Sequence, residues 1–346
     1  MHVLVVPSWY PTREAPLDGI YFAEQARCLA RHGLQVGVVY PEQQSLRRLS
    51  WPALKRNHFQ AGWAREDGVP TLRRHGWNVW SRFPPGQRCR VRSAVRLAER
   101  YVARHGAPDL VHAQSGRWAG AAAAVSTSLR RAVVNHGLAP SSDVTIHPNL
   151  APAAFFRAPP SARPSSPPFR LVTVARLSPQ KNVGGLLDAL ATQTGAETTL
   201  TIVGDGPRRS ELERRARALD LEDRVRFLGT LARAAVRRAL WDAHALVLPS
   251  RHETFGVVLL EAMATGLPVL ATASGGPEDL VTAETGLLVP PDDPEALAEG
   301  LSALRDRWPD FDAEAIRART REQYGPTAFV RRTRGLYRRA LHRGDH

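Results

Sequence analysis

Two cationic side chains and two closely spaced glycines have types and spacings that suit the binding of a diphosphate. Arg176 and Lys181 lie five residues apart in the segment RLSPQKN, and Gly204 and Gly206 flank one aspartate in the segment VGDGP. Guanidinium and ammonium groups neutralise phosphate oxygens, and a glycine lets backbone N–H groups approach an anion closely. These residues predict a phosphate-binding rim in the second half of the chain.

Short β-rich runs that alternate with helical patterns must position this rim. We expect six strands, at residues 169–177, 198–206, 224–229, 244–250, 268–274 and 286–292. Helices are expected between the first five strands, at residues 184–192, 209–221, 234–243 and 256–266. Right-handed connections would make this one doubly wound parallel sheet, in which ligands bind outside the carboxyl ends of the strands. The cations and the glycines follow two of those ends.

The first half of the chain shows a similar α/β alternation less regularly. Strands are expected at residues 2–7, 35–41 and 109–114, with a helix at 19–33, whereas residues 45–85 show no clear pattern. The density of proline and serine predicts a linker rather than a packed core at residues 150–168. The expected division is an N-terminal domain at 1–149, the linker at 150–168, a C-terminal domain at 169–325, and a basic helix at 326–346 that could cross back to the first domain.

The second half of the chain resembles the C-terminal domain of retaining glycosyltransferases of family 4. The resemblance covers residues 169–304 and lies in the segments VARLSPQKN, IVGDGP, RVRFLG and LPSRHETFGVVLLEAMATGLPVLATASGGPEDLV. The opening VVPSWYP, with DGIYFAEQARCLARHG after it, is similar to the N-terminal domain of the same family. The resemblance implies the GT-B fold, in which two Rossmann-like domains face each other across a cleft.

The resemblance also implies a donor substrate, a nucleotide diphosphate sugar, for which a UDP- or GDP-sugar is expected. Arg176 and Lys181 would grip the donor diphosphate, because fixed cations stabilise the charge that grows on the leaving phosphate. Glu253 would accept hydrogen bonds from hydroxyls of the donor sugar, and Glu261 from the nucleotide ribose. No metal and no cofactor would be required, since the cations and a helix N-terminus would neutralise the charge.

The remaining donor contacts that the resemblance implies surround these residues. The helix expected at 256–266 would turn its first N–H groups toward the phosphate, with Phe255 and Gly256 at its start. Thr254 would help to select the sugar. The expected donor-binding set is completed by residues that shape the rim or border the base: Gly204, Gly206, Arg226 and Phe227.

Three residues of the first half correspond to positions of the family that approach the donor from the other domain. Gly19 looks like the glycine that comes close to the donor phosphates, although it could simply begin a helix. His112 matches a histidine at the end of a strand and is assigned a catalytic role, with a core or strand-end histidine as the alternative. Gln114 stands where the family often has a second histidine; it can form hydrogen bonds with an acceptor but cannot carry a proton.

The N-terminal domain is predicted to be shortened. Between His112 and Asn149 the family normally has a further strand and helix, and this interval is too short to hold them. Since that domain binds most of the acceptor in the family, a degenerate or partner-dependent homologue that acts as a binding subunit is the alternative to an active enzyme.

A basic amphipathic helix is expected at residues 86–105. Arginines recur there every four residues, and the apolar side chains Val91, Val95, Ala98 and Val102 are expected to pack against the protein. Such a helix can rest on an anionic membrane, whereas the alternative is an ordinary solvated face. The arginines of this stripe are Arg88, Arg92, Arg96, Arg100 and Arg104.

The composition of the chain limits its possible binding partners and its expected location. A net charge of +14 suits phosphate-bearing molecules, an anionic membrane or nucleic acid, but no nucleic-acid module is recognisable, and a specific nucleic-acid partner is not expected. Two cysteines, Cys28 and Cys89, do not make a disulfide framework. Without a recognisable signal peptide or membrane-spanning stretch, the expected location is the cytoplasm, with peripheral contact at the inner membrane face left open.

The sequence therefore predicts a retaining, metal-independent glycosyltransferase of two Rossmann-like domains. The acceptor would offer a hydroxyl group on a glycolipid, a polysaccharide or a small secondary metabolite. A nucleotide-sugar epimerase or phosphorylase of the same fold fits the segments less well, and a nucleic-acid-binding protein is supported by charge alone.

Overall fold

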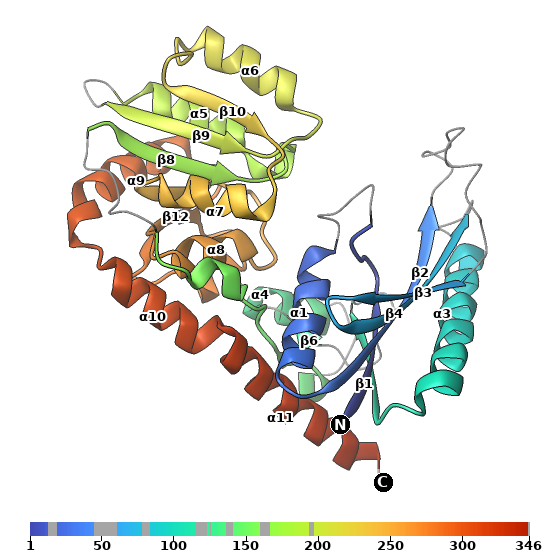
Figure 1. The fold of residues 1–346 in the computed structure, drawn as a ribbon. Helices are drawn as coiled ribbons and strands as arrows, with labels where there is room; N and C mark the ends of the chain where they lie inside the picture. Colours follow the sequence, from blue (N-terminus) through green and yellow to red (C-terminus); the bar gives the residue numbers. More distant parts are fainter. Residues whose placement is uncertain are drawn as a thin grey trace. The chain divides into compact units, whose positions relative to one another are not determined.

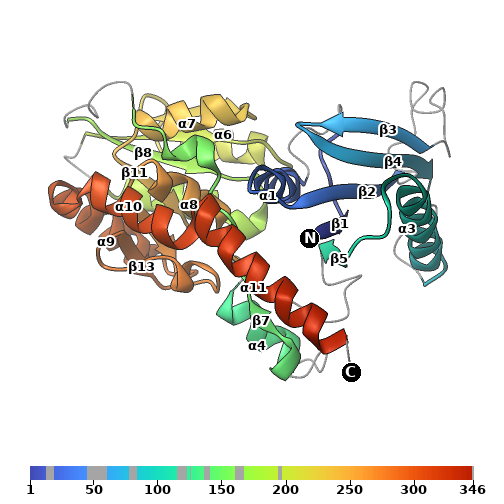
Figure 2. The same ribbon diagram turned by 60° about the horizontal axis from the view of Figure 1, so that its bottom comes forward.

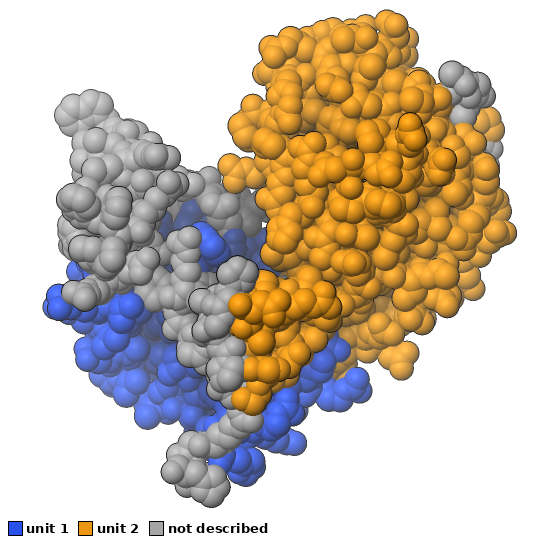
Figure 3. All heavy atoms as spheres, turned by 180° about the vertical axis from the view of Figure 1, so that it is seen from behind, with its two compact units in different colours: residues 1–122, 330–346 blue, residues 123–329 orange. Residues whose placement is uncertain are grey.

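The computed structural model describes residues 1–12, 19–44, 61–77, 84–114, 123–124, 126–135, 141–159, 167–193 and 197–344. The chain divides into two compact units, which Figure 3 distinguishes by colour. The first unit comprises Met1–Ala122 with Val330–His346, and the second comprises Ala123–Phe329. Each unit is built around a sheet whose strands are mostly parallel (Figure 1).

The sheet of the second unit has six parallel strands in the order β10-β9-β8-β11-β12-β13. Counted from β8, this is the 3-2-1-4-5-6 order of a doubly wound nucleotide-binding sheet, and the order reverses between β8 and β11. All six expected strands form, although each is shorter than its apolar run. Their bounds are β8 (Phe169–Val174), β9 (Thr198–Val203), β10 (Val225–Gly229), β11 (Ala245–Leu248), β12 (Val269–Thr272) and β13 (Gly286–Val289).

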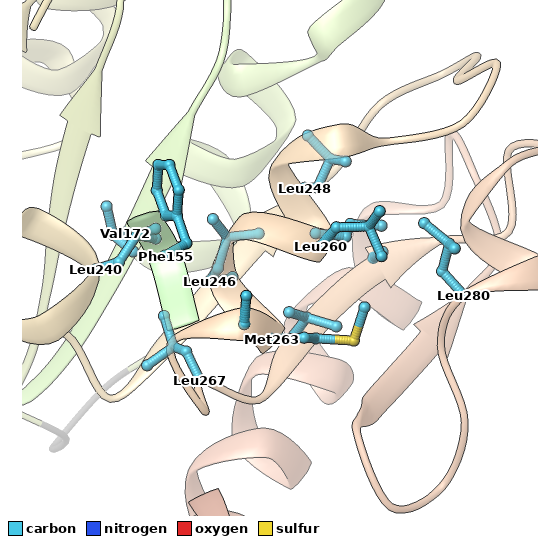
Figure 4. Packing of buried hydrophobic residues seen from close by; sticks show 14 of the residues in the cluster. Phe155, Val172, Leu240, Leu246, Leu248, Leu260, Met263, Leu267 and Leu280 are labelled. Atoms are coloured by element: carbon cyan, nitrogen blue, oxygen red, sulfur yellow. The ribbon is translucent and has the colours of Figure 1, made fainter. Parts of the chain in front are cut away.

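Helices cover both faces of this sheet, because alternate strand residues point to opposite sides. Leu171 packs with α5 (Val183–Ala191), α6 (Arg209–Ala218) and α9 (Pro294–Arg307). The neighbouring Val172 packs with α7 (Arg233–Trp241), α8 (Val257–Ala264) and α10 (Ala313–Tyr324). Figure 4 shows part of this second core, and Figure 2 shows α10 beside α8. Helix α8 is apolar almost all round, so it is buried on nearly every side.

The sheet of the first unit has the order β3-β4-β2-β1-β5. Four strands are parallel, and the edge strand β3 runs antiparallel to β4. Helices α1 (Ile20–Arg31) and α3 (Pro84–His105) pack against β2 and β4, on opposite sides of the sheet (Figure 1). The strands are β1 (His2–Pro7), β2 (Gln35–Gln44), β3 (Ala61–Glu66), β4 (Val69–Trp77) and β5 (Leu110–Gln114).

The β3–β4 hairpin lies in the stretch that showed no clear pattern in the sequence. Its turn is Asp67-Gly68, with φ of 48° and 88°. Positive φ at both central residues is what a two-residue hairpin turn requires, and Asp-Gly supplies it at little cost. The Asp-Gly dipeptide therefore indicates a hairpin turn, but the arginines and tryptophans around it obscured the pattern of the two strands.

The division of the chain differs from the one expected at residues 150–168. Residues 123–149 group with the second unit and carry β6 (Ala123–Ala124), α4 (Thr127–Asn135) and β7 (Thr145–Ile146). One contact of this segment with the rest of the second unit is a hydrogen bond of 2.6 Å from the backbone N–H of Thr127 to the Asp279 carboxylate. Since residues 115–122, 125 and 136–140 lie outside the described part, the shortening of the N-terminal domain stays a prediction.

The C-terminal region forms two helices, and the second lies where a basic helix was expected at residues 326–346. Helix α10 packs beneath α8, and α11 (Pro326–Gly344) follows it after Gly325. Helix α11 begins in the second unit and belongs to the first from Val330 onward. Within the described ranges, no helix is both long and apolar enough to cross a membrane.

Candidate functional site

The second unit presents its candidate site at the point where the strand order reverses. Strands β8 and β11 are hydrogen-bonded neighbours, and their chain continuations lead to helices on opposite faces of the sheet. The loop after β8 carries Arg176 and Lys181, and the loop after β11 carries Glu253. Ligands of doubly wound sheets bind at such a reversal, so the expected residues lie where the fold favours binding.

Lys181 and Glu253 contact each other directly across these two loops, through Nζ and Oε2. Their side chains are 21% and 12% exposed, so the pair is only partly screened by water. Both residues were expected from the sequence to bind the donor, but their ion pair was not predicted. The structure thus brings a cation and a carboxylate 72 positions apart into one small site.

Hydrogen bonds between the two loops fix this approach. The backbone N–H of Arg251 donates to the Gln180 carbonyl at 2.8 Å, and the Gln180 side chain donates to the His252 carbonyl at 2.8 Å. Lys181 ends a short 3-10 helix, η4 (Pro179–Lys181), after which Asn182 has a φ of 47°. The loops therefore hold each other, and Lys181 is placed by backbone contacts rather than by its own pair alone.

The backbone of Glu253 is also held from its other side. Its N–H donates to the Ser274 carbonyl at 3.0 Å, and its carbonyl accepts from Gly276 at 2.7 Å. A Cβ on Gly276 would lie 2.2 Å from Cα of Phe255, so only glycine lets these two segments cross so closely. The segment ASGGP after β12 is therefore a support of the site that the sequence reasoning did not assign.

Helix α8 begins immediately after this support. Gly256 precedes it with a φ of 87°, a conformation that glycine adopts readily. Phe255 is buried in the core and stacks edge-on with Tyr324, so its side chain anchors the turn and does not face the rim. Thr254 is exposed. The first turn of α8 offers N–H groups and the positive end of the helix dipole beside Glu253.

The two rim glycines allow close packing of one loop on another. A Cβ on Gly204 would lie 1.9 Å from the Ala175 carbonyl oxygen, and one on Gly206 would lie 2.3 Å from that of Leu177. The Leu177 N–H donates to the Asp205 carbonyl at 3.0 Å. The glycines thus support the backbone on both sides of Arg176, whose side chain is exposed at the rim.

Glu261 lies on α8 with only 3% of its side chain exposed, and it forms an ion pair with Nη1 of Arg233. A buried carboxylate needs such a partner, because an unpaired charge inside a protein is costly. The guanidinium of Arg233 also lies 4.8 Å from the ring centre of Phe155. Sequence reasoning missed Arg233; its position at the start of a helix in an arginine-rich chain offered no distinguishing signal.

The two residues expected near the base lie on β10. Arg226 is exposed, whereas Phe227 is half-buried and packs against the core that contains Leu171. Gly229 follows them, and its carbonyl accepts from the Gly204 N–H at 2.8 Å. This hydrogen bond joins the end of β10 to the glycine loop.

In the first unit, Gly19 precedes α1 with a φ of 70°. A Cβ there would lie 2.4 Å from the carbonyl carbon and oxygen of Trp9. Gly19 is therefore required by a close backbone crossing at the carboxyl end of β1, whether or not a ligand binds there.

His112 and Gln114 lie on β5, next to β1, where the strand order of the first unit reverses. Nδ1 of His112 is 2.7 Å from the phenol oxygen of Tyr337, which is buried on α11. Burial raises the pKa of Tyr337, so the phenol keeps its proton. Gln114 is buried and donates to the side chain of Gln25 at 3.0 Å. Tyr337 was not predicted, because 225 positions separate it from His112.

Comparisons with known proteins agree with this architecture. Residues 157–322 match the family model described as glycosyl transferases group 1. A component of the phosphatidylinositol N-acetylglucosaminyltransferase of Arabidopsis thaliana is 29% identical over 217 residues, which are 62% of this chain and 48% of that protein. The chain thus spans about half the length of this curated relative.

Solved structures match over nearly the whole chain. Sucrose-phosphate synthase of Thermosynechococcus elongatus superimposes with a TM-score of 0.72 at 19% identity, covering 99% of both chains. HepE of Anabaena, solved in complex with UDP and glucose, superimposes with a TM-score of 0.69 at 19% identity, covering 97% of this chain and 99% of the other. The expected GT-B fold of two Rossmann-like domains is confirmed. The match to the glycosyl transferases group 1 model spans residues 157–322, just under half of the chain.

Proposed function

We propose that the protein transfers a sugar from a nucleotide diphosphate sugar to an acceptor hydroxyl, with retention of configuration and without a metal ion. The observation that carries the proposal is the Lys181–Glu253 pair at the strand-order reversal, beside the N-terminus of α8. A cation for the diphosphate and a carboxylate for sugar hydroxyls occupy adjacent loops there. This is the arrangement that a donor sugar attached to a diphosphate requires.

The proposed chemistry breaks the bond between the anomeric carbon and the donor phosphate oxygen. The acceptor oxygen bonds to the same face of that carbon, and its proton passes to the departing phosphate, so charge and atoms balance. Negative charge grows on the phosphate as the bond breaks, and Arg176, Lys181 and the α8 amides would stabilise it. The ammonium has three donors, so Lys181 can keep Glu253 and still bind a phosphate oxygen.

The two glutamates would divide the recognition of the donor. Glu253, which is partly exposed, would accept hydrogen bonds from the sugar. Glu261, held by Arg233 on the buried helix α8, would accept from the ribose.

The comparisons suggest where to look for substrates. HepE is described in complex with UDP and glucose, and the Arabidopsis relative is named for transfer of N-acetylglucosamine to phosphatidylinositol. A UDP-sugar is therefore the first donor to test and a GDP-sugar the second. The acceptor would be a hydroxyl compound, with a lipid-borne acceptor tested first.

The test measures nucleotide release by the purified chain from UDP-, GDP- and ADP-sugars, with and without pooled acceptors. One nucleotide class should raise the thermal midpoint and be released faster when acceptor is present. Lys181→Ala and Glu253→Ala should abolish release while leaving the midpoint without ligand unchanged. Arg215→Ala, which removes an exposed arginine paired with Asp188, is the matched control and should retain activity. Near-normal turnover in either site variant would contradict the proposal.

A second candidate function is a partner-dependent binding subunit. The Arabidopsis relative is itself named as one subunit of its enzyme, and the acceptor-side domain is predicted to be shortened. Donor binding that depends on Lys181, without transfer or hydrolysis in the isolated chain, would favour this candidate. Turnover by the isolated chain would exclude it.

A further inference from the structure

Helix α3 of the first unit exposes apolar side chains that the sequence led us to expect inside. The side chains that pack against the sheet are those of Leu97 and Tyr101, in a cluster with Leu4, Val39 and Leu72. In contrast, Val91, Val95 and Val102 are 46%, 50% and 36% exposed. The expected inward valines thus form part of the outer face of the helix, and the reason is that Leu97 and Tyr101 already fill the space above β2 and β4.

The exposed valines are aligned rather than scattered. At about 100° per residue, Val91, Val95 and Val102 fall within about 40° of one another around the helix axis. Arg92, Arg96 and Arg100 are exposed and occupy the adjoining part of the same outer face, whereas the side chain of Arg88 lies outside the described part. Each valine on its own would be ordinary on a protein surface. Three valines aligned along one helix and bordered by arginines form an amphipathic surface, which a single exposed valine does not.

The charge of this face is one-sided. Among the α3 side chains that the structure describes, Glu99 is the single acid, against Arg92, Arg96, Arg100 and Arg104. The other arginine-rich helix, α6, is different, because Arg209 pairs with Glu213 and Arg215 pairs with Asp188. The charge on α3 is therefore available to an external anion.

The end of α3 adds an aromatic side chain. Trp63 of the edge strand β3 is 36% exposed, and its ring centre lies 5.1 Å from that of His105 and 4.8 Å from the guanidinium of Arg104. Tryptophan is enriched where protein meets the boundary between lipid headgroups and acyl chains. However, Trp63 also contacts Tyr101, which packs on the sheet, so it lies beside the inner side of α3 and is not part of the outer face.

We propose that the outer face of α3, made of Val91, Val95, Val102, Arg92, Arg96 and Arg100, docks on the surface of an anionic lipid bilayer. Arginines bind lipid phosphates while an apolar stripe enters the headgroup boundary, which is how amphipathic helices lie on membranes. A nucleic acid would use the arginines but leave the valine stripe in water. The apolar stripe therefore favours the bilayer over nucleic acid.

The test measures binding of the full chain to vesicles of phosphatidylcholine with about 30 mol% phosphatidylglycerol, by co-sedimentation at two salt concentrations. Pure phosphatidylcholine vesicles and random double-stranded DNA are the comparison ligands. The full chain should bind the anionic vesicles, more weakly at high salt, and bind neutral vesicles far less. Each arginine at such a surface contributes about 1 kcal/mol, so R92Q/R96Q/R100Q should weaken partitioning by about 100-fold.

Two further variants separate the proposal from simple charge attraction. V91Q/V95Q/V102Q keeps every charge and should weaken vesicle binding by roughly tenfold, since the buried apolar area is lost. R214Q/R215Q/R217Q removes the same charge from the exposed face of α6 and should leave binding within about twofold if attraction is local to α3. Thermal midpoints close to that of the parent chain establish that all three variants fold.

A probe on α3 itself provides a direct readout. Cys89 is exposed on this helix, whereas Cys28 is buried and its pKa is raised to about 11, so an environment-sensitive fluorophore should react with Cys89 alone. Anionic vesicles should shift its emission to the blue. The proposal is overturned if the valine variant binds vesicles like the parent chain, if the α6 variant weakens binding as much as the α3 arginine variant, or if DNA is bound more tightly than anionic vesicles. None of these readouts depends on enzymatic activity.

Discussion

At the scale of single residues, charged groups of the candidate site have partners that the sequence did not reveal. Lys181 contacts Glu253, Arg233 contacts Glu261, and Tyr337 contacts His112. These partners determine which charges and which hydrogen-bond donors are presented to a ligand. They also allow the role of each group to be tested by changing its partner.

Replacing Arg233 should affect the donor more than the chemistry. Arg233→Met leaves the Glu261 carboxylate buried without its cation, which should lower the free energy of unfolding by about 1–3 kcal/mol. A displaced Glu261 should raise the KM for donor about tenfold with a smaller change in kcat. The double variant Arg233→Met/Glu261→Gln should recover stability but not donor affinity. Equal losses in kcat and in affinity for the donor would argue that Glu261 does more than bind the ribose.

Replacing Tyr337 tests how His112 is oriented. The buried phenol keeps its proton because its pKa is raised, and its oxygen lies 2.7 Å from Nδ1 of His112. We expect the phenol to donate to Nδ1, which would leave the proton of the neutral ring on Nε2. We expect nitrogen NMR of the ring to report this tautomer in the parent chain and a mixture in Tyr337→Phe. If His112 contacts the donor, kcat should fall several-fold in Tyr337→Phe, and Tyr337→Ala should be worse because it also leaves a cavity. An unchanged tautomer in the phenylalanine variant would contradict the assignment.

At the scale of elements, the site depends on loops that cross at distances only glycine allows. Gly204 and Gly206 pack on the backbone beside Arg176, and Gly276 packs on Phe255. The strands bring the loops to one edge, but the missing Cβ atoms let them interlock. The glycines therefore shape the site by letting its loops pack closely, as well as by letting a ligand approach the backbone.

A pair of glycine substitutions should have opposite effects. Gly204 has a φ of 129° and no room for a Cβ, so Gly204→Ala should lower the free energy of unfolding by more than about 2 kcal/mol. Gly335 lies within α11 with only the end of a flexible arginine near it, so Gly335→Ala should stabilise by about 0.5–1 kcal/mol. Denaturant unfolding measures both changes. Similar values for the two variants would show that the crowding at Gly204 is relieved at low cost.

At the scale of the whole molecule, the C-terminal segment completes the first unit. Arg334 donates to the His32 carbonyl at 2.6 Å, and Tyr337 reaches His112. Both contacts lie within the first unit, although more than 200 positions separate the partners. The first unit thus depends on residues that lie far away along the chain.

Removing residues 330–346 should destabilise one unit selectively. Backbone amides of β5 and of the end of α1 should exchange with solvent faster, since they lose the packing of α11. Amides of β11 and β12, in the core of the second unit, should keep their protection. Hydrogen exchange followed by mass spectrometry measures both regions in one sample. Uniform acceleration across the chain would mean that the units do not unfold separately.

Local sequence was sufficient to specify most of the second unit. Short apolar runs, each followed by a helical pattern, predict parallel strands with crossover helices, and all six strands form where they were expected. The same pattern indicates which loops end at one edge of the sheet, so Arg176, Lys181, Gly204 and Glu253 could be assigned to one rim. Local periodicity and turn chemistry carry that information.

The partners of the site residues and the buried face of α3 were settled by contacts between distant segments. Which carboxylate meets Lys181 and which phenol meets His112 cannot be read from local patterns. In α3, the valine stripe and the side that carries Leu97 and Tyr101 are both apolar, so periodicity alone did not identify the inner face. The fit of Leu97 and Tyr101 above the sheet decided it. Residues 123–149 joined the second unit for the same reason, because contacts at long range outweigh proximity along the chain.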